Sequence, residues 1–142
     1  MPITRSSDQP SKTLEQFYLD VSQQESYSSK STGRPMLELL KMINITFPDT
    51  QLWGLTSLHR LVIQRENHWR SPWYIIVSAV GNEYDLDYLM PEDKSPWLGA
   101  RVVGGATSLA EARRKLIIAM HECEGWSGNE ELAELVRFLN EE

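Results

Sequence analysis

Residues 72–124 read PWYIIVSAVGNEYDLDYLMPEDKSPWLGARVVGGATSLAEARRKLIIAMHECE, and this stretch decides the fold. It begins with two runs rich in β-branched and aromatic residues, 73–80 and 83–90, which only Gly81 and Asn82 separate. A two-residue loop that contains glycine is typical of the tight turn of a β-hairpin. The sequence therefore predicts an antiparallel hairpin at this point of the chain.

Side chains alternate between the two faces of a strand, so pairing Val80 with Glu83 assigns every residue of the hairpin to one face. The first face is almost wholly apolar and is expected to lie on the core; it carries Trp73, Ile75, Val77, Ala79, Tyr84, Leu86, Tyr88 and Met90. The second face is half apolar and half acidic; it carries Tyr74, Ile76, Ser78, Val80, Glu83, Asp85, Asp87 and Leu89. Such a mixed face needs a cover, either from the N-terminal helices or from a partner.

A long amphipathic helix is predicted after the hairpin. Ser108 and Glu111 match a capping box, apolar residues then recur at helical spacing, and Gly125 ends the run. Similar signals predict two helices before the hairpin, one helix near the C-terminal end and two further strands. The helices are expected near residues 14–21, 35–45 and 132–139, and the strands at 58–65 and, at an edge, 100–103.

These elements predict one α+β domain over residues 12–142. Its sheet is expected to be antiparallel, with three to four strands, and to carry two N-terminal and two C-terminal helices packed on it. A chain of 142 residues is long enough to bury one such core. Residues 1–11 are polar and contain proline, so we expect them to form a flexible segment.

Composition excludes several classes of function. Fourteen basic and twenty acidic residues give a net charge of −6. Such a surface repels the phosphates of nucleic acids, so we do not expect general nucleic-acid binding. The single cysteine rules out an internal disulfide. Neither a signal peptide nor a membrane-spanning run is evident, so we expect no membrane association and a cytoplasmic location.

The carboxylates of the second hairpin face are the first candidates for chemistry. Asp85 and Asp87 stand two residues apart, and such a pair can hold a divalent cation or act as an acid and a base. Their Cα atoms are about 6.8 Å apart in a strand, however, and the opposite strand offers neither a histidine nor a third carboxylate. No HExxH, P-loop or adjacent cysteine–histidine pair occurs either. The sequence therefore predicts no catalytic residue, no metal and no cofactor, and favours a non-enzyme.

Tryptophan is the second unusual feature, with five copies in the chain. Trp53, Trp69, Trp97 and Trp126 fall in predicted loops or at element ends. Tryptophan is enriched at binding hot spots, although it also closes the ends of small cores because it buries a large area. We assign Trp97 to a binding surface and leave the end-closing role open for all four.

The leading hypothesis is a small acidic, non-catalytic binding protein that docks on a basic protein partner, as an inhibitor, immunity protein or accessory factor does. The predicted binding residues are Tyr74, Glu83, Asp85, Asp87 and Trp97. Two alternatives remain open. One is a small metal-assisted hydrolase that uses Asp85 and Asp87, and the other is a structural domain that self-associates as a homodimer through its second sheet face.

Overall fold

The computed structural model describes residues 2–25 and 31–141. It confirms the α+β class, with helices on the N-terminal and C-terminal sides of the main strands. The elements in chain order are β1 (Thr4–Arg5), α1 (Leu14–Gln24), α2 (Gly33–Thr46), β2 (Trp53–Ser57), β3 (Arg60–Gln64), β4 (Ile75–Val80), β5 (Glu83–Leu89), the short 3-10 helix η1 (Glu92–Lys94), β6 (Arg101–Ala106), α3 (Leu109–Glu122) and α4 (Glu130–Asn140).

The strands form one sheet in which β1 to β6 follow each other in sequence order. Neighbours from β2 to β6 pair antiparallel, whereas β1 pairs parallel with β2. The prediction of an antiparallel sheet of three to four strands is therefore wrong, because the sheet has six strands and is mixed.

The first of the two missed strands is β2. The stretch predicted as one strand, 58–65, is the turn and second arm of a hairpin formed by β2 and β3. Its turn residues are Leu58 and His59, and Leu58 adopts a left-handed conformation with φ 58°. Leucine rarely adopts this conformation, which glycine or asparagine usually supplies. The sequence has neither residue at this turn and therefore gave no sign of it.

The segment expected to be flexible, residues 1–11, contains the second missed strand, β1. Ile3 is buried, and its N–H donates to Asn44 Oδ1 on α2 at 2.7 Å. Arg5 Nη2 donates to Thr56 Oγ1 on β2 at 2.6 Å. These contacts tie the described part of the segment to the sheet, which composition alone does not reveal.

The hairpin of β4 and β5 has the predicted register, with Val80 opposite Glu83 and Val77 opposite Leu86. The pairing of Trp73 with Met90 is not formed, because β4 begins only at Ile75. Trp73 is 39% exposed, so its predicted place in the core is wrong.

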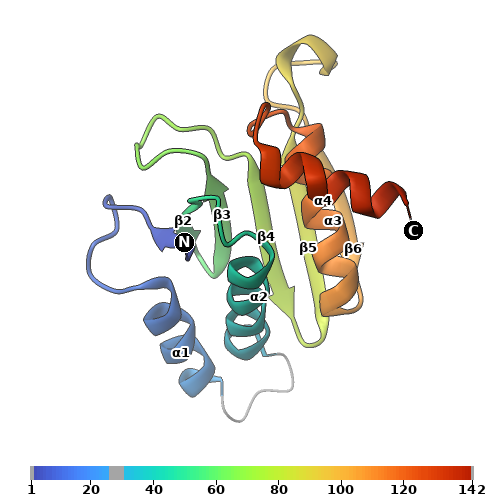
Figure 1. The fold of residues 1–142 in the computed structure, drawn as a ribbon. Coiled ribbons are helices and arrows are strands. Elements are labelled where there is room, and N and C mark those ends of the chain that lie inside the picture. Colours follow the sequence, from blue (N-terminus) through green and yellow to red (C-terminus); the bar gives the residue numbers. More distant parts are fainter. Residues whose placement is uncertain (1, 26–30, 142) are drawn as a thin grey trace.

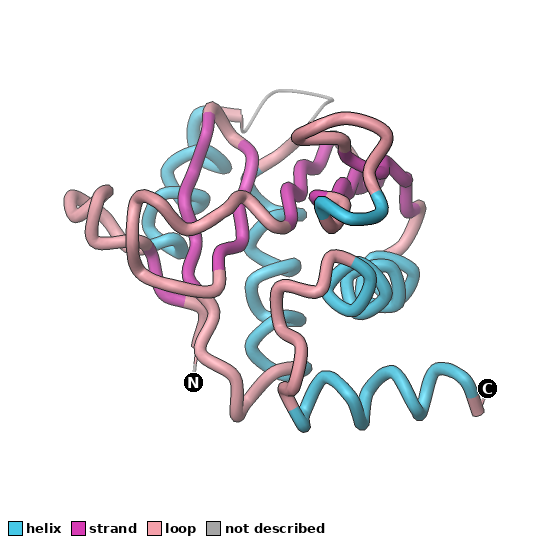
Figure 2. Tube along the Cα trace, turned by 90° about the horizontal axis from the view of Figure 1, so that it is seen from above, coloured by secondary structure: helices cyan, strands magenta, loops and turns pink. Residues whose placement is uncertain are grey.

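Helices pack on the apolar face of the sheet, which we call the inner face. The core there combines Val77 and Leu86 with α2 and α3, and the Tyr84 hydroxyl donates to the Pro35 carbonyl at 3.0 Å. Figure 1 shows α2 and α3 in front of the strands. In Figure 2, α3 lies between the strands and the C-terminal helix α4, so α4 forms an outer layer.

The N-terminal helices α1 and α2 meet at an unusually close point. A Cβ on Gly33 would lie 2.3 Å from the backbone nitrogen of Ser22, so only glycine fits there without a shift of the backbone. The Glu25 carboxylate accepts the N–H groups of Thr32 (2.8 Å) and Gly33 (2.9 Å). The residue that follows α1 thereby satisfies two backbone donors at the start of α2.

The second sheet face, here called the outer face, receives none of the described helices. Over β3 the loop 65–72 folds back on it, because Gln64 Nε2 donates to the Ser71 carbonyl at 2.9 Å. Val62 and Ile76 on this face are buried, whereas Val80 at the end of β4 and Val103 on β6 are exposed, so the face is open near the hairpin turn and on β6. The N-terminal helices are therefore not the cover of the outer face.

Candidate functional site

The open part of the outer face carries a compact group of residues that we call the acidic patch, defined as Ser78, Val80, Glu83 and Asp85. The strand register places Val80 opposite Glu83 and Ser78 opposite Asp85. Both carboxylates are exposed, and neither forms an ion pair with any residue that the structure describes. The patch therefore presents two uncompensated negative charges beside one exposed aliphatic side chain.

Asp87, the third predicted carboxylate, is in a different situation. Arg101 on β6 donates its Nε–H to the Asp87 carboxylate, and both side chains are mostly buried. The same guanidinium reaches the Tyr74 carbonyl from Nη2 at 3.4 Å. Asp87 is thus neutralised within the molecule, and Asp85 and Asp87 do not form a free carboxylate pair.

The two aromatic members of the predicted site lie away from the acidic patch. Tyr74 packs against Trp126 with ring centroids 5.2 Å apart, and its ring fills the space where a Cβ on Gly125 would lie. Trp97 is 70% exposed, in the loop between η1 and β6. That loop follows the end of β5, whereas Glu83 begins the strand, so the two residues occupy opposite ends of the hairpin (Figure 1).

Of the five predicted binding residues, the structure therefore brings together Glu83 and Asp85. Local alternation sufficed to find this pair. The position of Tyr74 depends on the loop between α3 and α4, and the ion pair of Asp87 depends on β6, so the hairpin sequence carried no signal for either.

The remaining tryptophans have different environments. Trp126 is buried in the core cluster and closes the end of the sheet, although its Nε1–H has no hydrogen-bond partner among the described residues. Trp69 is exposed; its ring stacks with that of His68, and the Arg70 guanidinium carbon lies 4.7 Å from its centroid. The end-closing role thus holds for Trp126.

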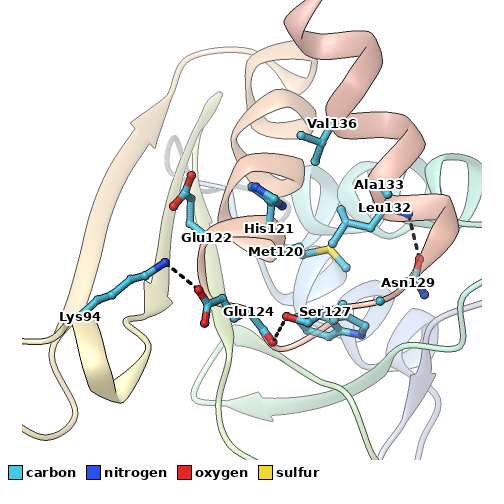
Figure 3. Close-up of a pocket in the computed structure, with 12 residues that line it drawn as sticks. Lys94, Met120, His121, Glu122, Glu124, Ser127, Asn129, Leu132, Ala133 and Val136 are labelled. Carbon is cyan, nitrogen blue, oxygen red and sulfur yellow. Dashed lines mark hydrogen bonds and ion pairs between the residues drawn. The ribbon is translucent and has the colours of Figure 1, made fainter.

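A cavity of about 410 Å³ lies between α3 and α4. Figure 3 shows Met120 and His121 of α3 and Leu132 of α4 among the side chains that line it. The ion pair of Lys94 and Glu124 lies beside it, with 2.7 Å between the charged atoms. The cavity combines an apolar floor with a polar rim, and it contains none of the residues predicted to bind.

Histidine, cysteine, aspartate and glutamate do not gather in any group of three or more that could hold a metal ion, within the described ranges 2–25 and 31–141. Among these residues no helix combines the length and apolar character that a membrane crossing requires.

Cys123 is the one cysteine of the chain and the residue to consider as a nucleophile. The thiol is buried, and this burial raises its pKa to about 11, so the reactive thiolate is scarce near neutral pH. We expect the folded protein not to react with a disulfide reagent such as DTNB at pH 8, and the urea-unfolded protein to release one equivalent of chromophore. Rapid reaction of the folded protein would contradict the buried position.

The same thiol affects stability at high pH. The folded chain keeps the proton at pH values at which the unfolded thiol, with a pKa near 9.0, releases it. The contribution of this group to the free energy of unfolding is therefore constant below pH 9 and falls as the pH rises toward 11.

Comparison of the chain with protein-family models, with curated proteins and with solved structures finds no match.

Proposed function

We propose that this protein is a non-catalytic binding protein that docks on a basic protein partner through the acidic patch. The observation that supports the proposal is the open outer face, where the Glu83 and Asp85 carboxylates have no compensating cation among the described residues. Inhibitors, immunity proteins and accessory factors act by this kind of contact.

Charge argues for a basic partner. The net charge of −6 attracts a positively charged surface at long range, and complementary charges mainly raise the association rate and the specificity. At short range Val80 and Ser78, which lie on β4 opposite the two carboxylates, supply uncharged contact area beside them. An arginine or lysine side chain of the partner gains both an ion pair and contact with Val80.

The hydrolase alternative gains nothing from this geometry. A general base or a metal ligand needs an available carboxylate, and Asp87 is already bound by Arg101. Asp85 then keeps only Glu83 as a neighbouring carboxylate, and the described residues contain no group of three ligands that could hold a metal ion around this pair.

The test compares the protein with its Asp85→Lys variant as bait in a quantitative pull-down from host lysate, followed by reconstitution with the purified partner. Reversing this charge places a cation against a basic surface, so the dissociation constant is expected to rise about tenfold or more. The loss should shrink as salt is added, because exposed charges are screened.

Glu141→Lys is the matched control, since it makes the same charge change at an exposed position at the end of α4. Thermal unfolding of both variants shows whether the fold is kept. Equal capture by Asp85→Lys and Glu141→Lys would contradict docking at the acidic patch, and so would a partner that carries no basic surface.

A further inference from the structure

β6 is the last strand of the sheet, so one side of its backbone has no neighbouring strand among the described residues. The Ala100 carbonyl accepts the Met90 N–H at 2.9 Å, and hydrogen bonds alternate in direction along an antiparallel strand. The N–H and C=O groups of Arg101, Val103 and Gly105 therefore point away from β5. The Lys115 ammonium donates to the Gly105 carbonyl, which confirms this direction.

Apolar side chains flank this open backbone on both sides. Val103 is 74% exposed on the outer face, and Val102 is partly exposed on the inner face next to Ile118 of α3. These inner-face residues line an apolar hollow of about 150 Å³ at the junction of β6 and α3. An exposed strand edge with apolar flanks is a surface that readily pairs with another strand.

The charges on α3 indicate that the strand pairing with β6 belongs to a second copy of the chain. The side of the helix toward the open edge carries Glu111, Lys115, Ile118 and Glu122 at three- and four-residue spacing. Lys115 precedes Ile118 by three residues and Glu122 follows it by four. A second copy of α3 that runs in the opposite direction beside the first places Lys115 of each chain next to Glu122 of the other. Lys115 pairs with Glu111 of its own helix at 3.2 Å and donates to Gly105, and its third N–H remains for the second chain. The surface is therefore complementary to itself.

We propose that the chain forms a homodimer in which β6 pairs antiparallel with β6 of a second copy across a two-fold axis. The axis passes near Val102 and Ile118, and each of these residues faces its own counterpart. Arg101 lies opposite Val103 of the second copy, and two such residue pairs exchange about four backbone hydrogen bonds. This register leaves the bond between Lys115 and the Gly105 carbonyl intact.

The arrangement keeps all helices of both chains on one side of a continuous sheet, because an axis perpendicular to the sheet preserves its faces. It differs from a dimer made through the second sheet face, since the contact is the strand edge. The acidic patch stays open, so the dimer does not rest on the proposed docking function.

The first test measures the mass of the full chain by sedimentation equilibrium, alone and with Val103→Pro. Proline removes an N–H that the single chain does not use, so the fold is kept and the dimer is lost. Val103→Thr is the matched control, because it keeps both the branched shape and the N–H, and it is expected to remain a dimer. A wild-type chain that stays monomeric at about 1 mM would overturn the proposal, and so would a dimer that Val103→Pro leaves unchanged.

The second test uses charge exchange and does not depend on the tolerance of proline. Lys115→Glu alone and Glu122→Lys alone each place like charges together at two symmetric contacts, and the dimer dissociation constant is expected to rise roughly tenfold. A mixture of the two variants pairs opposite charges again, so native mass spectrometry should show mixed dimers. Failure of the mixture to associate better than either variant alone would overturn the predicted antiparallel arrangement of α3.

Discussion

Replacing Gly33 with alanine is expected to lower the free energy of unfolding by roughly 3 kcal/mol, at the upper end of overpacking effects. The added Cβ would lie 2.3 Å from Ser22 N and 2.6 Å from the Tyr18 carbonyl oxygen, and both are backbone atoms that cannot rotate away. Either α1 must move from α2 or the start of α2 must unwind. Urea unfolding followed by tryptophan fluorescence measures the loss.

Gly104→Ala provides the control for this experiment. No atom lies within 4 Å of the added Cβ there, and the backbone is in an ordinary extended conformation. Alanine at such a site stabilises by about 0.5 kcal/mol or has little effect, because it mainly restricts the unfolded chain. A loss at Gly33 no larger than that at Gly104 would show that α1 does not pack against α2 as described.

Truncating Leu39 to alanine is expected to cost about 3 kcal/mol, within the range for large-to-small changes in a core. Leu39 is 0% exposed, on the side of α2 that faces the sheet. Its removal leaves a cavity that the surrounding helices cannot close without separating from the strands. Urea unfolding measures the loss. If the slope of the free energy of unfolding against urea concentration is the same for both proteins, the loss belongs to the folded core.

Ile45→Ala is the matched control, since it deletes an aliphatic side chain of equal size from the same helix. Ile45 is 71% exposed, so its truncation should change the free energy of unfolding by about 0.5 kcal/mol or less. Comparable losses at the two positions would mean that α2 is turned differently about its axis from the orientation described above.

The parts of the fold that sequence reasoning found are those that local rules determine. The turn at Gly81 and Asn82 fixes the register of β4 and β5, and that register by itself brings Glu83 and Asp85 together. The start of α3 was equally legible: Ser108 Oγ accepts the Glu111 N–H at 3.1 Å, and the Glu111 carboxylate returns to the Thr107 N–H at 3.2 Å.

The parts that sequence reasoning missed depend on contacts between distant segments. β1 pairs Thr4 with Trp53, and a two-residue strand has no periodicity to detect. The β2–β3 turn at Leu58 lacks a residue typical of turns, so the hairpin was not recognised and β2 was missed. In the candidate site, Arg101 neutralises Asp87 only because β5 pairs with β6, and the hairpin sequence alone does not specify that pairing.

The two edge strands of the sheet, β1 and β6, have different consequences for solubility. On the β1 side the last strand is only two residues long, and very short terminal strands are one of the devices by which proteins avoid uncontrolled aggregation. On the β6 side the strand is six residues long, and the backbone groups of Arg101 and Val103 point toward the open edge. A sheet with one edge strand that can pair accepts one further chain, and the pair then has no free edge strand left. In the proposed dimer, assembly by strand addition accordingly stops at two chains and does not grow into a fibre.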